Sequence, residues 1–268
     1  MFIDPMLQDL GALELVSPVA GVRIPVAQVG SEVPPHRHPQ GQLVLVVKGS
    51  ATCDVEDAIW MAPPNCAVWI PGGLEHSIRV TANAEVLYLF VQSGIARLPD
   101  YCCTLALSPL VRELIQYMAD QPDGYAQDSP TGRKAGVLIE DLAAMPIERL
   151  HLPLSSEPRL RRMAQMLSED PSDRRTAQEW ARSLGLSERS LARLVRQETG
   201  LTYGRWRRQL HLIVAMRELS AGEPVQRVAE RLGYESVTAF ITMFKKALGS
   251  PPARYFAELQ ARRAGRTY

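Results

Sequence analysis

The sequence of 268 residues is poor in cysteine and has no long apolar run. Its four cysteines show no CxxC spacing, and the adjacent pair Cys102 and Cys103 cannot easily form a bridge. We therefore expect reduced, mostly buried thiols in a cytoplasmic protein. The longest apolar stretches, such as 43–47 and 86–91, are far shorter than the roughly 18 residues that suggest a membrane span. Residues 1–15 contain no Lys or Arg, so they lack the basic start of a signal peptide.

The sequence also has little net charge, because 30 Lys and Arg residues oppose 29 Asp and Glu residues. The two signs are distributed unevenly. Residues 1–154 carry nine basic and seventeen acidic residues, whereas residues 155–268 carry twenty-one basic and twelve acidic ones. The formal charges of the two parts are therefore −8 and +9. Such an asymmetry is typical of an acidic module joined to a nucleic-acid or membrane binder.

The acidic part begins with a β pattern. Between residues 22 and 95, short runs rich in Val, Ile, Leu, Trp and Tyr alternate with Pro and Gly turns at a spacing of about 8–12 residues. This pattern predicts a sandwich or a small barrel. After Pro99, apolar residues recur at intervals of three and four, which predicts helices at 107–119 and 134–145.

The stretch 150–158 is the predicted linker between the two parts, and from Arg159 onward the pattern is helical. The sequence therefore predicts an α+β multidomain protein. Its expected segments are a β-barrel-like domain at 1–98, a helical linker or dimerisation segment at 99–153, and an all-α domain at 154–268.

The basic part contains a duplicated helical unit. Three residues of the first copy recur 48 residues later in the second. They are Ala181, Leu184 and Gly185, which correspond to Ala229, Leu232 and Gly233. The small residue lets two helices cross closely, the glycine supplies the turn, and Ser187 or Ser236 caps the second helix. This logic predicts two helix-turn-helix units, at about 177–198 and 225–248.

Two further features of this part favour DNA as the partner. The second helix of the first copy presents Arg189, Arg193 and Arg196, which can reach guanine edges and phosphates from a major groove. Residues 203–220 predict one continuous helix between the copies, about 27 Å long. That length suits two recognition helices held about one DNA turn apart, roughly 34 Å.

The stretch 229–255, AERLGYESVTAFITMFKKALGSPPARY, resembles the signature of the AraC/XylS-type transcription regulators. The resemblance covers about residues 158–257 and implies two helix-turn-helix subdomains that read adjacent major grooves. It implies base contacts from the second helix of each copy, with Arg196, Lys245 and Lys246 at the helix ends placed for phosphates. The DNA-binding candidates are Ser187, Arg189, Ala192, Arg193, Arg196, Ser236, Val237, Thr238, Thr242, Lys245 and Lys246. The second copy has no long polar side chain at the base-facing positions, so we expect weaker sequence reading there.

The acidic part contains a histidine pattern. His36 and His38 lie two apart before a predicted strand and can point the same way. Gln42 follows, and His76 comes after a Pro-Gly-Gly turn. This spacing resembles the two cupin motifs over about residues 30–92, although metal-binding cupins usually have Glu at the position of Gln42.

Two interpretations of this pattern remain open. Three neutral imidazoles, from His36, His38 and His76, form an adequate site for Zn, Ni, Cu or Fe. Alternatively, His36, His38 and Gln42 form a polar patch around an organic ligand in a metal-free sensor pocket. The effector-binding candidates are His36, His38, Gln42, Trp60, Trp69, His76 and Tyr88.

The leading hypothesis is a DNA-binding transcription regulator whose cupin domain senses a small-molecule effector. The expected partners are double-stranded promoter DNA, the effector, a second copy of the chain, and RNA polymerase if the protein is an activator; no membrane is expected. The apolar stripes of the helices at 107–119 and 134–145 could be covered by the barrel or could pair with a second copy, and the family resemblance favours pairing. The candidates for pairing between two copies are Leu110, Leu114, Leu138 and Leu142. The sequence leaves open the effector, the promoter, and whether the protein activates or represses.

An enzyme is the competing hypothesis. A three-histidine cupin site can host Fe(II) oxygen chemistry or isomerisation, and a metal-sensing regulator would use the same residues. No Glu completes the ligand set, and no acid–base pair is evident beyond Glu75 beside His76. We therefore expect no catalytic residues and no enzymatic activity.

Overall fold

The computed structural model divides the chain into two units, residues 1–151 and 152–268. No helix among the described residues combines the length and the hydropathy that a membrane span needs. The described parts of the chain are 15–25, 31–56, 58–62, 66–82, 84–148, 151–155 and 157–257.

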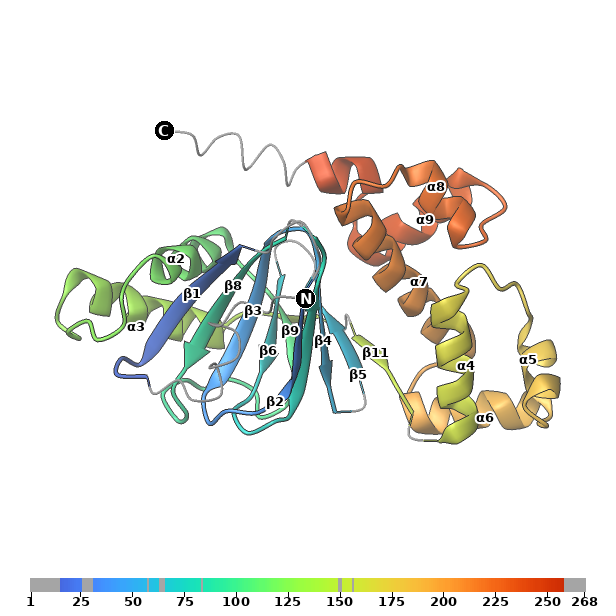
Figure 1. Cartoon of the computed structure of the whole chain (residues 1–268), viewed down its shortest axis with the longest axis horizontal. Helices are drawn as coiled ribbons and strands as arrows, with labels where there is room; N and C mark the ends of the chain where they lie inside the picture. Colours follow the sequence, from blue (N-terminus) through green and yellow to red (C-terminus); the bar gives the residue numbers. More distant parts are fainter. Residues whose placement is uncertain are drawn as a thin grey trace. The chain divides into compact units, whose positions relative to one another are not determined.

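The first unit is built on two β-sheets (Figure 1). The strand order is β1-β8-β3-β6-β9-β10 in the first sheet and β11-β5-β4-β7-β2 in the second. The strands are β1 (Val19–Pro25), β2 (Ser31–His36), β3 (Gly41–Lys48), β4 (Ala51–Val55), β5 (Ala58–Met61), β6 (Cys66–Ile70), β7 (His76–Val80), β8 (Glu85–Val91), β9 (Cys103–Ala106), β10 (Ile147–Glu148) and β11 (His151–Pro153).

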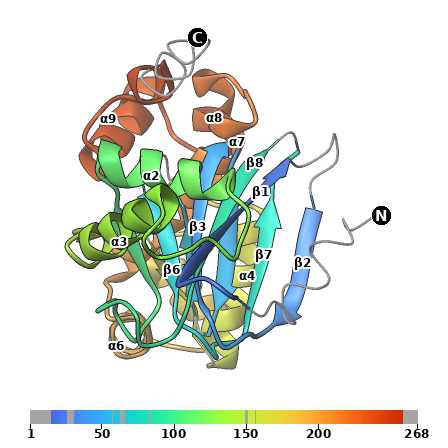
Figure 2. The same ribbon diagram turned by 90° about the vertical axis from the view of Figure 1, so that its left-hand side faces the viewer.

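The first sheet is covered on both faces, which explains the unbroken apolar runs of its central strands. Along β3, Val44 and Val46 belong to an inner cluster that side chains of both sheets share. Leu43 and Leu45 belong to an outer cluster that the sheet shares with α2 (Pro109–Ala119) and α3 (Pro130–Ala143). Figure 2 shows these two helices in front of the first sheet. A strand buried on both faces is therefore apolar at most of its positions.

The helical segment after Pro99 is therefore part of the first unit, and β9 and β10 add strands to it. The helices were expected at 107–119 and 134–145, close to where α2 and α3 lie. Leu138 and Leu142 are 0% and 1% exposed in the outer cluster, so the prediction that they can pair with another chain is wrong. Leu114 is partly buried in the same cluster, whereas Leu110 is 54% exposed. A helical stripe shows that one face is covered but does not identify what covers it.

The second unit is entirely helical in its described part after residue 157. Figure 1 shows α7 joining the α5–α6 pair at one end to the α8–α9 pair at the other. Thr176, Ser187, Thr202 and Ser236 cap four of these helices, as side-chain oxygens commonly do. The helices are α4 (Pro158–Glu169), α5 (Ala177–Ser183), α6 (Glu188–Thr199), α7 (Tyr203–Ser220), α8 (Val225–Arg231) and α9 (Val237–Leu248).

The two repeat glycines occupy equivalent turns but have different surroundings. Gly185 and Gly233 have φ angles of 68° and 72°, in the left-handed region that favours glycine. A Cβ on Gly185 would meet nothing within 4 Å. A Cβ on Gly233 would lie 2.7 Å from the carbonyl oxygen of Ser172, in the loop between α4 and α5. The second turn is therefore packed against the chain, whereas the first is open.

This difference predicts unequal costs for the same substitution. Gly185→Ala should destabilise the fold by about 1–2 kcal/mol, the usual cost of a left-handed non-glycine residue. Gly233→Ala should cost more, because the loop at Ser172 has to move as well. Urea unfolding of the full chain, followed by far-ultraviolet circular dichroism, measures both. Equal losses would show that the contact with Ser172 has no energetic weight.

Candidate functional site

The recognition helix of the first repeat, α6, has one buried and one exposed face. Ser187 begins the helix by accepting a hydrogen bond from the N–H of Ser190 at 3.1 Å. Leu191 and Val195 are 0% and 1% exposed and form the inner face. The outward face consists of four exposed candidates, Arg189, Ala192, Arg193 and Arg196.

The three arginines of this face are chemically available. Within the described residues, none of their guanidinium groups takes part in a hydrogen bond or an ion pair. A row of unpaired guanidinium groups on a rigid helix can meet phosphates and the acceptor edges of guanine. The face therefore fits an anionic, groove-shaped partner.

The recognition helix of the second repeat, α9, is less polar. Ser236 caps it by accepting from the N–H of Ala239 at 3.2 Å. Thr242 donates its hydroxyl proton to the carbonyl of Thr238 at 2.8 Å, which leaves its methyl group and an acceptor lone pair for a partner. Thr238, Lys245 and Lys246 are exposed and Val237 is half-buried, with Phe240 and Phe244 on the buried face.

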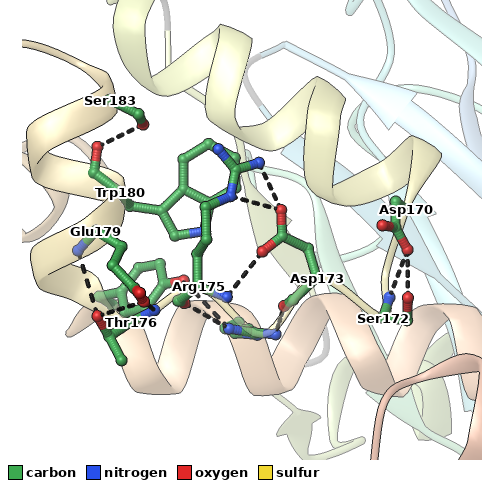
Figure 3. A network of polar contacts seen from close by, with 10 residues as sticks. Asp170, Ser172, Asp173, Arg175, Thr176, Glu179, Trp180 and Ser183 are labelled. Carbon is green, nitrogen blue, oxygen red and sulfur yellow. Dashed lines mark hydrogen bonds and ion pairs between the residues drawn. The ribbon is translucent and has the colours of Figure 1, made fainter.

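A polar network that the sequence reasoning did not identify anchors the first repeat (Figure 3). Asp173 accepts from Nε of Arg175 at 2.8 Å, and the Arg175 guanidinium lies 3.6 Å from the centre of the Trp180 ring. Hydrogen bonding from Arg175 lowers the pKa of Asp173. Thr176 and Glu179 form a reciprocal capping box at the start of α5. The Thr-x-x-Glu pattern was visible in the sequence, whereas the stacking of Arg175 on Trp180 was not.

Three histidines of the first unit converge at one point between its sheets. His36 ends β2, His76 begins β7, and the two residues are paired across the strands. The ring centroids of His36 and His38 lie 4.3 and 5.1 Å from that of His76. One ligand-type nitrogen from each ring lies within 4.8 Å of the others. The structure therefore brings together the three histidines that the sequence pattern selected.

Backbone carbonyls orient the imidazole rings. Nδ1 of His36 lies 2.9 Å from the carbonyl of Pro34, and Nδ1 of His38 lies 2.8 Å from that of Gln40. Nδ1 of His76 lies 2.9 Å from the carbonyl of Leu74. A carbonyl oxygen only accepts hydrogen bonds, so each Nδ1 carries a proton, and in a neutral ring Nε2 then keeps a lone pair.

Burial favours the neutral form of the His38 and His76 rings. His38 and His76 are 4% and 2% exposed. Burial lowers the pKa of His76 to about 4 and also lowers the pKa of His38. Two of the three rings are therefore uncharged near neutral pH and can offer lone pairs to a cation or to a hydrogen-bond donor.

Gln42, on β3, lies between two of the rings and is 0% exposed. Its amide oxygen is 3.0 Å from Nε2 of His38 and 2.9 Å from Nε2 of His76. That oxygen can accept hydrogen bonds from both nitrogens only if each ring is protonated on both of its nitrogens. Each ring would then be positively charged, which burial opposes. A half-turn of the amide places its nitrogen there instead, and this nitrogen can donate to both neutral rings.

The residues also fit a metal ion. Nε2 of His36 is buried and has no hydrogen-bond partner among the described residues. A cation between the three Nε2 atoms would satisfy this atom and the other two, and the Gln42 oxygen could be its fourth ligand. Histidine ligands whose other nitrogen donates to a carbonyl are the usual arrangement around protein-bound metals.

The aromatic candidates for the effector site lie in different places. Tyr88 is 2% exposed in the inner cluster, beside Phe90, whose ring lies 5.5 Å from that of His38. Trp60 stacks on His151 with 4.3 Å between the ring centroids. Phe90 was missed, although its position two residues after Tyr88 places it on the same strand face.

Trp69 does not belong with the histidines. It lies in the outer cluster beneath the helices, its indole N–H donates to the carbonyl of Pro99 at 2.8 Å, and its ring packs on Gly41. Neighbouring residues of a strand point to opposite faces, and Trp69 is out of phase with the inner residues Val68 and Ile70. Its assignment to the effector site is therefore wrong.

Comparison with known proteins agrees with this architecture. Residues 26–92 match the cupin domain family, and residues 180–258 match the helix-turn-helix domain family. The HTH-type transcriptional regulator NimR of Escherichia coli (strain K12) is 49% identical over 226 residues, which cover 84% of this chain and 83% of NimR. The HTH-type transcriptional regulator RipA of Corynebacterium glutamicum is 28% identical over 119 residues, 44% of this chain and 36% of RipA.

Among solved structures, ToxT from Vibrio cholerae strain SCE256, with a bound unsaturated fatty acid, matches 91% of this chain and 96% of its own chain. The sequence identity is 10% and the TM-score is 0.37. The relatives are transcription regulators rather than enzymes. The fold class and the family resemblance predicted from the sequence are confirmed. The chain belongs to the AraC-type helix-turn-helix transcription regulators, with a cupin domain preceding the DNA-binding helices.

Proposed function

We propose that the protein regulates transcription by binding promoter DNA through α6 and α9 and by sensing a ligand at the three-histidine cluster. The observation that carries the DNA-binding role is the row of unpaired guanidinium groups along the exposed face of α6. A free cation on a capped, rigid helix is ready to bind an anionic duplex without first breaking an ion pair.

The two recognition helices have different proposed roles. Arg189 and Arg193 read bases, because their side chains can form bidentate hydrogen bonds with guanine. On α9, Thr238 and Thr242 offer methyl groups and short hydroxyls, which suit thymine methyls and positioning contacts. Lys245 and Lys246 lie in the last turn of α9 and contact phosphates as point charges.

Ligand binding at the cluster controls DNA binding by favouring one arrangement of the DNA-binding unit over another. A ligand with equal affinity for both arrangements would shift nothing. The effector is a small molecule with hydrogen-bond donors that match the Nε2 lone pairs and an apolar part that packs on Phe90 and Tyr88. The protein acts as a homodimer, for which the exposed Leu110 remains a candidate contact.

The DNA-binding role predicts different effects of two cation deletions. Arg193→Ala should lose about 1–3 kcal/mol of discrimination at one base pair while retaining nonspecific binding. Lys245→Ala should weaken binding to all sequences. It should also reduce the slope of the logarithm of affinity against the logarithm of salt concentration by about one, because one phosphate contact is lost. The measurement is affinity for duplexes selected from a random library, over a series of salt concentrations.

Arg227→Ala is the matched control, because Arg227, on α8, is already ion-paired with Glu223, which precedes the helix. Its sequence preference should equal that of the unchanged protein. A full-length protein with neither salt dependence nor site preference would refute the proposed DNA-binding role.

A metal-sensing regulator is the second candidate function, favoured by the three Nδ1–carbonyl contacts that direct lone pairs to one point. A bound divalent transition metal (Zn, Ni, Cu or Fe) would supply a cation that draws the three rings and the Gln42 oxygen together. The protein's own residues hold the rings in one tautomer and exclude bulk water from His38 and His76. The same site would then report metal rather than an organic effector.

Calorimetric titration of the metal-depleted full chain with Zn²⁺ and Ni²⁺ distinguishes the two candidates. Metal sensing predicts one ion per chain, loss of binding in His76→Ala, and altered DNA binding after chelation. Gln42→Glu should bind the metal at least about tenfold more tightly, because a carboxylate adds negative charge and cannot donate to the rings.

His151→Phe, which keeps an aromatic ring on Trp60, is the histidine control and should bind metal normally. No metal binding, combined with thermal stabilisation by an organic compound that requires His38, would assign the site to an organic effector. A compound at a hundred times its Kd stabilises the folded state by about 2.7 kcal/mol.

A further inference from the structure

A row of polar side chains on α7 links the two helix-turn-helix repeats. Tyr203, Arg207 and His211 are four residues apart, so they lie along one face of the helix. Each is half-buried or buried. The first two meet the loop before α5, and the third meets the turn between α8 and α9, so the row spans both repeats.

Arg207 binds the loop of the first repeat through backbone carbonyls. Its guanidinium donates to the carbonyl of Asp173, to the carbonyl of Arg175 at 3.1 Å and to the hydroxyl of Tyr203 at 3.4 Å. The Asp173 carboxylate and the Trp180 ring hold the Arg175 side chain, as Figure 3 shows. The carbonyls that Arg207 contacts are therefore part of an anchored segment.

His211 extends the row to the second repeat. Nε of Arg207 donates to Nε2 of His211 at 3.5 Å, and Nδ1 of His211 lies 3.2 Å from the hydroxyl of Tyr234. The Tyr234 ring meets the rings of His211 and Phe240 edge-on, each at 5.5 Å between centroids. Phe240 is the buried anchor of α9, so Tyr234 connects α7 to the second recognition helix.

The loop between α4 and α5 also touches the second repeat directly. The carbonyl of Ser172 lies so close to Gly233 that a Cβ there would be 2.7 Å away. One loop, held by Arg207, thus contacts the first repeat, α7 and the turn of the second repeat.

We propose that Arg207 is a positioning residue that fixes the angle between α6 and α9 and thereby the spacing of the DNA half-sites that the protein accepts. This inference rests on the proposed DNA-binding function. A tilt of about 10° along a helix roughly 27 Å long moves its far end by about 5 Å, more than the roughly 3.4 Å between base pairs. A small loss of rigidity in the row would therefore change which spacings fit.

The geometric test requires no DNA. Cysteines introduced at exposed positions on α6 and α9, Gln197→Cys and Ala247→Cys, carry nitroxide labels, and double electron–electron resonance measures the distribution of distances between them. The four native cysteines are buried, so they react slowly with the label. We expect one narrow distribution for the otherwise unchanged full chain and one at least about twice as broad for Arg207→Met. Arg208→Met removes the same charge from an exposed neighbouring position and should leave the distribution narrow.

The functional test inserts one base pair between the half-sites of a duplex selected from a random library. We expect affinity to fall at least about tenfold for the unchanged protein and for Arg208→Met, as for a poorly matched site. For Arg207→Met the loss should be less than about threefold, with the preference at each half-site retained. Arg207→Lys keeps the charge but loses the planar guanidinium group with its several N–H donors. Its loss of affinity on insertion should lie between that of the unchanged protein and that of Arg207→Met.

Circular dichroism establishes that each variant is folded, and Tyr234→Phe, which keeps the ring and removes the hydroxyl, replaces Arg207→Met if the latter fails to fold. An unchanged distance distribution in a folded Arg207 variant, even one with a lowered Tm, would overturn the inference and leave Arg207 a merely stabilising residue. A broadened distribution with no selectable DNA site would support the positioning role and refute the proposed function.

Discussion

Each recognition helix is held by one apolar face buried in the second unit, and the exposed chemistry of that unit follows from this burial. Leu191 and Val195 anchor α6, and Phe240 and Phe244 anchor α9. Because these side chains occupy one face of each helix, the opposite face remains in water. Guanidinium and ammonium groups can stay charged there without an internal partner, whereas burying them unpaired would be very costly.

The β domain shows the opposite use of burial. Its histidines lie inside, where desolvation keeps His38 and His76 neutral, and backbone carbonyls decide which nitrogen of each ring holds the proton. The arrangement leaves lone pairs directed at one another, which is unfavourable unless a donor or a cation lies between them. Gln42 suits either case, since the nitrogen end of its amide can donate to the rings and the oxygen end can be a ligand to a cation. This property explains why the same residues fit two classes of ligand.

The failed predictions have a common physical origin. The pattern around Leu138 and Leu142 correctly indicated a buried face, but the covering surface is the first sheet rather than a second chain. Trp69 was expected, with Trp60 and Tyr88, to form a wall of the effector pocket of the barrel. Its strand is apolar on both faces, so the sequence gives no sign of which face is inner.

The sequence by itself determined the elements whose signals are local. The capped helices of the two repeats, the left-handed glycine turns, the charge division and the His-x-His pattern depend on neighbouring residues only, and the fold class and family followed from them. Tertiary structure alone decided how distant segments meet. Examples are the Gln42 amide between His38 and His76, the stacking of Arg175 on Trp180, and the row from Arg207 to Tyr234. These contacts join residues through the packing of whole elements, which no periodicity along the chain records.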